Sequence, residues 1–134
     1  MPQVVLSSIC GEVIATIDPS MTSLMPLHDV ESVDAAIAES RERPVLLFKH
    51  SRYCGVSCEA LDELQSHIDS QPSRAVAYRM VTVQTHRSVS DAISQRLGIR
   101  HETPQAILLR DGKPVWNASH FRINSRQLDQ IVAG

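Results

Sequence analysis

The fold is decided by residues 44–58, which read PVLLFKHSRYCGVSC. The continuous apolar run at residues 45–48 is typical of a strand covered on both faces, and therefore of a central strand with a parallel neighbour. From Gly55 onward, apolar residues recur at helical spacing, namely Cys58, Leu61, Leu64 and Ile68. The stretch therefore predicts a strand, a turn at residues 50–55 and a helix.

The rest of the chain alternates predicted strands and helices around this unit. The further predicted strands are residues 25–27, 76–83, 105–109 and 115–118, with Asp111-Gly112 as a hairpin signal between the last two. The predicted helix N-caps are Asp29, Ser88 or Ser90, and Asn124. The predicted helix stops are Pro44, residues 71–73 (QPS) and Gly98.

This order of elements predicts an α/β fold with a central mixed sheet of about four strands and helices on both faces. It is the order of a thioredoxin-like fold, an assignment that rests on analogy of architecture. We expect residues 22–134 to form this domain. Residues 1–21 are expected to be an N-terminal extension that forms a β-hairpin or an arm.

Composition narrows the function classes. The chain has 134 residues, 43% hydrophobic and 21% charged, which predicts one globular domain. A net charge of −2 and only five aromatic residues make nucleic acid and anionic membranes poor partners. No apolar run approaches the ~20 residues that span a bilayer, and three cysteines are too few for a disulfide scaffold. We therefore expect a cytoplasmic protein with reduced thiols.

Cys54 is the strongest candidate for a reactive residue. It falls where the predicted strand turns into the helix N-terminus, and there unpaired backbone N–H groups and the helix dipole favour a thiolate. Arg52, or His50 if charged, would add to this effect. A thiolate is the attacking species in disulfide exchange, so the position suits a nucleophile.

Cys58 lies one helical turn after Cys54, and two roles are open for it. Residues four apart on a helix have Cβ atoms about 5–6 Å apart, whereas a disulfide needs about 3.5–4.5 Å. A helix whose first turn unwinds slightly could close the bond, and Cys58 would then be a resolving cysteine. Its place on the apolar stripe favours instead a buried, inert thiol.

Thr103-Pro104 precedes a predicted strand. X-Pro is the only bond at which the cis form is cheap. By analogy with the fold, we expect a cis bond that exposes the Thr103 backbone beside Cys54, where it can pair with an extended substrate.

Two other functions compete with thiol chemistry. His50, Cys54 and Cys58 could bind a metal, with the set completed by Cys10, His67 or His101. The sequence has one C-x3-C and scattered histidines rather than the two close pairs of a structural zinc site, so no metal or bound cofactor is expected. The second alternative is a non-enzymatic binding or stress module with structural cysteines.

Three segments together resemble the YtxJ-like bacillithiol-system proteins, the monothiol bacilliredoxins. They are residues 44–51 leading into 54–57, residues 101–106 (HETPQA) and residues 111–120 (DGKPVWNASH), in order and at matching distances over about residues 22–133. The resemblance implies a small cytosolic oxidoreductase of thioredoxin-like fold that takes a low-molecular-weight thiol, such as bacillithiol, off a client protein's cysteine. It implies Cys54 as the attacking cysteine and Pro104 as the cis-proline.

Two positions depart from that family pattern. Gly55 stands where proline usually follows the active cysteine, and Cys58 adds a second thiol. Together they could let Cys54 and Cys58 form an internal disulfide. We therefore predict a thiol–disulfide oxidoreductase with Cys54 and Cys58 as catalytic residues. The residues expected to bind the substrate are Thr103, Pro104, His50 and Arg52.

Overall fold

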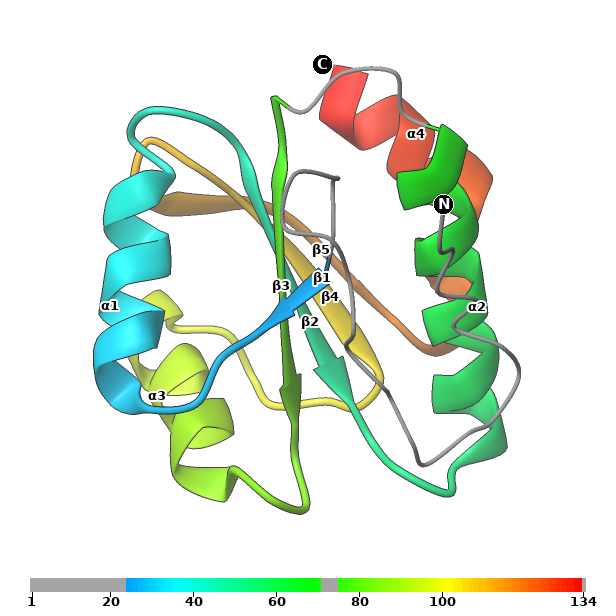
Figure 1. Ribbon diagram of the computed structural model, residues 1–134, viewed down its shortest axis with the longest axis horizontal. Coiled ribbons are helices and arrows are strands. Elements are labelled where there is room, and N and C mark those ends of the chain that lie inside the picture. The colour runs from blue at the N-terminus through cyan, green and yellow to red at the C-terminus, as the bar shows by residue number, and fades with distance from the viewer. Residues whose placement is uncertain (1–23, 71–74, 134) are drawn as a thin grey trace, which may run out of the picture.

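The computed structural model describes residues 24–70 and 75–133, which form a five-stranded sheet with helices on both faces (Figure 1). The elements are β1 (Leu24–Pro26), α1 (Val30–Glu39), β2 (Val45–His50), α2 (Gly55–Ser70), β3 (Ala77–Thr82), α3 (Arg87–Leu97), β4 (Gln105–Arg110), β5 (Lys113–Ser119), the 3-10 helix η1 (His120–Arg122) and α4 (Ser125–Ala133). The predicted extension at residues 1–21 and the helix stop predicted at residues 71–73 lie outside the described residues.

The strand order is β1-β3-β2-β4-β5, and the sheet is mixed. Strand β3 pairs in parallel with β1 and β2, whereas β4 pairs antiparallel with β2 and β5. Every residue of β2 is buried, which confirms the prediction of a central, doubly covered strand. The predicted thioredoxin-like fold is confirmed, with five strands instead of about four.

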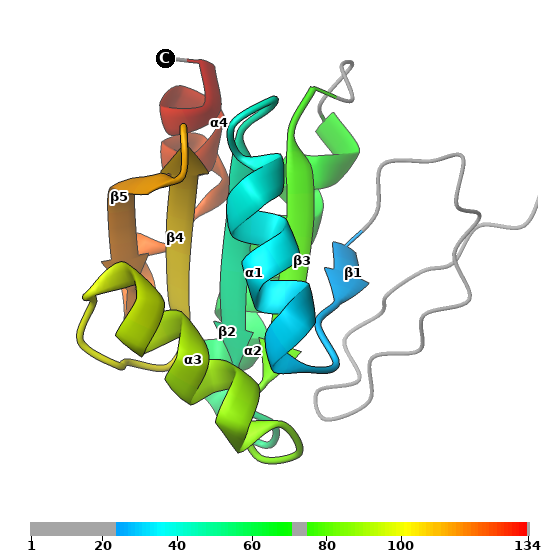
Figure 2. The ribbon, with the colours of Figure 1, turned by 90° about the vertical axis from the view of Figure 1, so that its left-hand side faces the viewer.

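The sheet lies between two layers of helices (Figures 1 and 2), and a hydrophobic core fills the space between the sheet and each layer. Helices α2 and α4 cover one face, where Leu46 and Phe48 of β2 pack against Leu64 and Leu128. Helices α1 and α3 cover the other face, where Val45 and Leu47 belong to the core. Successive β2 residues therefore face opposite helix layers, as alternation along a strand requires.

Most predicted helix and turn signals are confirmed. Asp29 caps α1, because its side chain accepts the Ser32 N–H and the Ser32 hydroxyl oxygen accepts the Asp29 N–H. Gly98 ends α3 with φ 65°, in the left-handed region that favours glycine. At the hairpin, Asp111 and Gly112 both have positive φ, and Asn124 accepts the Gln127 N–H at the start of α4.

The predicted cap of α3 is wrong. The helix begins at Arg87 after His86, which makes no side-chain cap hydrogen bond, and Ser90 is fully buried inside the helix. The chain turns directly after β3, with the His86 N–H donating to the Thr82 carbonyl at 3.0 Å. The N-cap position, His86, therefore lies two residues before Ser88 and four before Ser90.

The buried face of α2 is also rotated from the predicted stripe. Leu64 and Ile68 are buried as expected, but Cys58 and Leu61 are only partly buried. Ser57 and His67 take buried places beside the leucine, since both are hydrogen-bonded inside the fold. No helix in the described part of the chain is both long and apolar enough to cross a membrane.

Candidate functional site

Cys54 is the residue from which α2 begins. Its carbonyl accepts the Cys58 N–H at 2.9 Å, which is the first hydrogen bond of a helix of 16 residues. The side chain is partly exposed and carries a thiol rather than a disulfide. Cys54 therefore lies at the positive end of a long helix dipole, as the sequence predicted.

The turn before Cys54 has a left-handed residue that is not glycine. Tyr53 has φ 61°, a conformation that L side chains rarely adopt, and its ring is 79% exposed. Arg52 donates from Nη2 to the Tyr53 hydroxyl at 3.3 Å, and its Cζ lies 5.3 Å from the ring centroid. The turn thus presents an aromatic ring and a guanidinium next to the thiol.

His50 lies behind this turn and not on its surface. It is fully buried, and its Nδ1 is 2.8 Å from the Ser57 hydroxyl, which also accepts the Ser51 N–H at 2.9 Å. Burial, with a smaller contribution from the positive charge of Arg52, lowers the pKa of His50 from 6.5 to about 4. The ring is therefore neutral near pH 7, and the positive charge considered for His50 is not available there.

Gln84, from the loop after β3, is hydrogen-bonded to the same turn. Its Oε1 accepts the Arg52 N–H at 3.0 Å, and its Nε2 donates to the Ser51 hydroxyl at 2.8 Å. Sequence reasoning missed Ser57 and Gln84 as site residues. Ser57 lies within the quoted motif and faces the turn from the first turn of the helix, whereas nothing in the sequence points to Gln84.

The Thr103–Pro104 bond is cis, as expected. Lys49 of β2 pairs with Gln105 of β4, so residues 103–104 lie beside the turn that leads to Cys54. Pro104 is buried and Thr103 is partly exposed, and the Pro104 carbonyl accepts the His120 N–H at 3.1 Å. The predicted substrate-side segment and the cysteine are therefore at the same end of the sheet.

The model for the family of monothiol bacilliredoxin BrxC matches residues 25–128. The chain belongs to the monothiol bacilliredoxin family. The chain is 30% identical to a solved structure described as a proposed oxidoreductase with a thioredoxin fold, with a TM-score of 0.71. The match covers 80% of this chain and 91% of the chain in that structure. Thioredoxins of Malassezia sympodialis and Fasciola hepatica are 14% and 17% identical. Both have TM-scores of 0.66, with 84% and 82% of this chain covered and 90% and 97% of theirs. These two support the fold alone.

The second cysteine of the motif is in a different state from the first. Cys58 is disulfide-bonded and only partly buried, so the expectation of reduced thiols and the alternative of a buried, inert thiol are wrong for this residue. Because Cys54 carries a thiol, that bond does not join the two. A resolving role for Cys58 therefore requires that its own disulfide be reduced first. Cys10 lies outside the described residues.

The other histidines considered as metal ligands are engaged in separate contacts. His67 lies between the Asp129 carboxylate, 2.5 Å from Nδ1, and the Tyr78 hydroxyl, 2.8 Å from Nε2. His101 Nδ1 is 3.1 Å from Lys49 Nζ. Among residues 24–70 and 75–133, no group of three or more His, Cys, Asp or Glu side chains is arranged to hold a metal ion.

Proposed function

We propose that this member of a thioredoxin-fold oxidoreductase family removes a low-molecular-weight thiol, bacillithiol being the one that the family name indicates, from cysteines of client proteins. The observation that carries the proposal is the partly exposed thiol of Cys54 at the N-terminus of α2. First-turn N–H groups stabilise a thiolate at such a position, and a thiolate is the species that attacks disulfides.

The reaction is two successive exchanges. The Cys54 thiolate attacks the small-thiol sulfur of the mixed disulfide, a new S–S bond forms between Cys54 and the small thiol, and the client leaves as a thiolate. A second thiolate then attacks the small-thiol sulfur on Cys54 and releases Cys54 as a thiolate. The electron pair for the net reduction comes from that second thiol, so no bound cofactor is required.

The second thiol has two sources in this proposal. A further molecule of the low-molecular-weight thiol gives a symmetric small disulfide as product. In the Cys58 route the attack is on the other sulfur: the Cys58 thiolate attacks the Cys54 sulfur, an internal Cys54–Cys58 disulfide forms, and the small thiol leaves as a thiolate. This route opens only after the disulfide that holds Cys58 has been reduced. The first route is available in the state of the protein described above, and we therefore favour it.

The neighbours of Cys54 support a role in docking the client. Thr103 offers backbone groups beside the turn, to which an extended client segment can add as a strand does. Two exposed rings, Tyr53 at 79% and Phe121 at 70%, give apolar area near the site. Ser57 and Gln84 hold the turn, and we assign them as positioning residues.

The test uses a peptide carrying one cysteine in mixed disulfide with bacillithiol, incubated with reduced protein and bacillithiol. We expect peptide thiol to be released, with mass spectrometry detecting the small thiol on Cys54 as the intermediate. Cys54→Ser should abolish both signals, whereas Cys58→Ser should keep them if the small thiol is the resolving group. Equal release by the parent and Cys54→Ser would leave the non-enzymatic binding module as the better description.

A further inference from the structure

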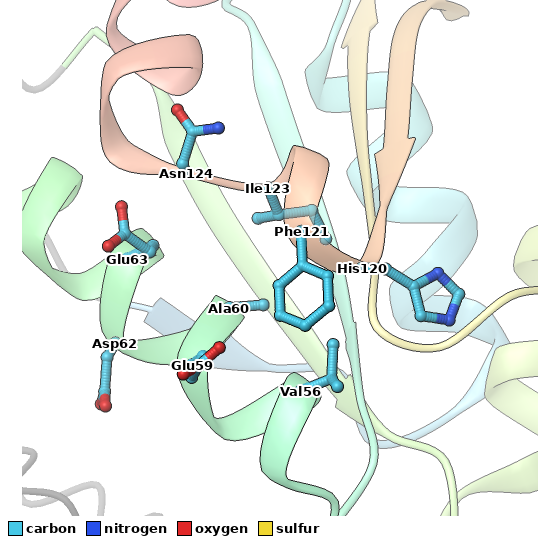
Figure 3. Close-up of a pocket in the computed structure, with 9 residues that line it drawn as sticks. All are labelled: Val56, Glu59, Ala60, Asp62, Glu63, His120, Phe121, Ile123 and Asn124. Carbon is cyan, nitrogen blue, oxygen red and sulfur yellow. The ribbon is translucent and has the colours of Figure 1, made fainter.

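A groove of about 350 Å³ runs along α2 from the end that carries Cys54 (Figure 3). One wall is a helical stripe at i, i+3, i+4 and i+7, formed by Val56, Glu59, Ala60 and Glu63. Phe121 and Ile123, from η1 and the residue that follows it, form the other wall. Figure 3 shows the Phe121 ring facing Val56 and Ala60 of α2, with the carboxylates along the α2 side.

The charge of this groove has one sign. Glu59, Asp62 and Glu63 line it, and the described lining residues include neither lysine nor arginine. Glu59 and Asp62 are exposed, while Glu63 accepts the Ser125 N–H at 2.6 Å and so also holds the start of α4. Arg122 lines a second hollow, which Phe121 also borders, and it is not among the residues that line this groove.

The Phe121 ring adds a second feature that favours a cation. It is 70% exposed, although it is a large apolar side chain, and it follows His120, whose φ of 58° is left-handed. An exposed aromatic face beside carboxylates attracts ammonium and guanidinium groups, and it also packs along the apolar stems of Lys and Arg side chains.

We propose that this groove selects client segments that carry a lysine or arginine close to the cysteine under attack. The proposal rests on the proposed function and names the class of client that the Cys54 site prefers. The basic side chain is identified as the occupant by charge complementarity with the groove. The groove lies close to the thiol, because it begins at Val56, two residues after Cys54.

The length of the helix sets the spacing of that basic residue. Glu59 and Glu63 lie five and nine residues after Cys54, which is about 7.5 Å and 13.5 Å along the helix axis. An extended client segment advances about 3.3 Å per residue. The basic residue therefore lies about two to four positions from the client cysteine.

The experiment measures reduction of bacillithiolated peptides that differ at one position, three residues before or three residues after the cysteine. Lys and Glu are compared at each place, and 2-hydroxyethyl disulfide is a neutral substrate without a peptide. We expect the preferred Lys peptide to react about three- to tenfold faster than its Glu partner, and this ratio to fall in 0.5 M salt. Binding of the same peptides to Cys54→Ser, by fluorescence anisotropy, repeats the comparison without chemistry.

The variant that tests the groove is the double substitution Glu59→Gln with Asp62→Asn. Glu63 is left in place because it holds α4. The matched control is Glu42→Gln, an exposed carboxylate in the turn before β2, at the opposite end of the sheet. The double variant should lose the preference for Lys in both rate and binding, whereas the control should keep it.

Two outcomes overturn the proposal. One is equal rates and equal affinities for the Lys and Glu peptides with the parent protein. The other is a Lys preference that survives the double variant, which would place the recognition elsewhere. Failure of the proposed function would give a different result, in which the parent reduces 2-hydroxyethyl disulfide no faster than Cys54→Ser does. The binding comparison would then still show whether the groove prefers a basic residue.

Discussion

Replacement of the buried Lys49 by methionine should stabilise this protein near neutral pH. Lys49 is 1% exposed, and its Nζ donates to the Ser94 hydroxyl at 2.7 Å and lies 3.1 Å from His101 Nδ1. Burial lowers the pKa of Lys49 from 10.5 to about 8, although Asp91 acts in the opposite direction. The folded state therefore disfavours the charge that Lys49 carries at pH 7.

The magnitude follows from the shift of 2.5 pH units, the difference between 10.5 and about 8. At about 1.4 kcal/mol per pH unit, the charged lysine lowers the free energy of unfolding by about 3.5 kcal/mol below pH 8. Methionine removes this cost but loses two hydrogen bonds worth about 1 kcal/mol each. Ser94 and His101 both reach solvent, so neither is left buried without a partner. The net gain at pH 7 is about 1–2 kcal/mol.

The pH dependence has a definite sign. Between pH 8 and 10.5, the unfolded chain keeps the Lys49 proton and the folded chain does not, so stability of the parent rises with pH. The gain from Lys49→Met should therefore shrink by about 2 kcal/mol between pH 7 and 9.5. The raised pKa of Tyr78 acts equally on both proteins and cancels in the difference.

Urea unfolding of parent and Lys49→Met, followed by circular dichroism at pH 7, 8.5 and 9.5, measures this difference. A loss of stability at pH 7, or a difference that does not change up to pH 9.5, would refute the reasoning. The same variant should reduce bacillithiolated peptide more slowly, because Lys49 ties α3 to the loop that carries Thr103. Stability and activity are thus expected to move in opposite directions.

Three further predictions concern residues that hold the turn and the helices around the site. Gln84→Ala should slow peptide reduction severalfold while changing the free energy of unfolding by less than about 0.5 kcal/mol, because it removes only the exposed hydrogen bonds that hold the turn. Reduction kinetics and urea unfolding measure the two values. Asp129→Asn should lower the free energy of unfolding in urea by about 1 kcal/mol. The loss is small because the Asp129 side chain, which contacts His67, is half exposed to solvent. Leu64→Ala should cost about 2–5 kcal/mol in the same assay, because its side chain is fully buried in the core.

Much of the fold could be predicted from local signals in the sequence. The run at residues 45–48 gave the central strand because only a doubly covered strand is apolar on both faces. Asp29, Gly98 and the Asp111-Gly112 turn were predictable because each meets a backbone requirement of its own segment. The prediction of Ser90 as a cap was wrong because it used the same kind of local signal. A serine before apolar residues resembles a helix N-cap, but Ser90 is fully buried within α3.

The cysteine and the cis-proline could also be predicted, but the side chains that hold them could not. His50 invited the assignment of a charge near Cys54 because its ordinary pKa lies near neutrality. Its burial depends on the packing of α2 against the sheet, and its hydrogen bond to Ser57 forms only when the helix folds back over the turn. Gln84 reaches the turn across 33 residues of sequence, and no spacing rule applies at that distance.

The end of β2 shows how one strand supports both sides of the site. His50 faces α2 and is joined to the turn through Ser57, whereas Lys49 faces α3 and is joined to the loop before Pro104 through His101. Two consecutive buried polar residues therefore hold two different segments, because alternation along the strand sends them to opposite layers. A substitution at His50 should alter the turn that presents Cys54, while one at Lys49 should alter the loop to which we propose that the client docks. Cys54 follows the turn that His50 holds and lies at the end of the sheet where Lys49 holds the loop before Pro104. These two contacts explain why a strand otherwise composed of apolar residues ends in a lysine and a histidine.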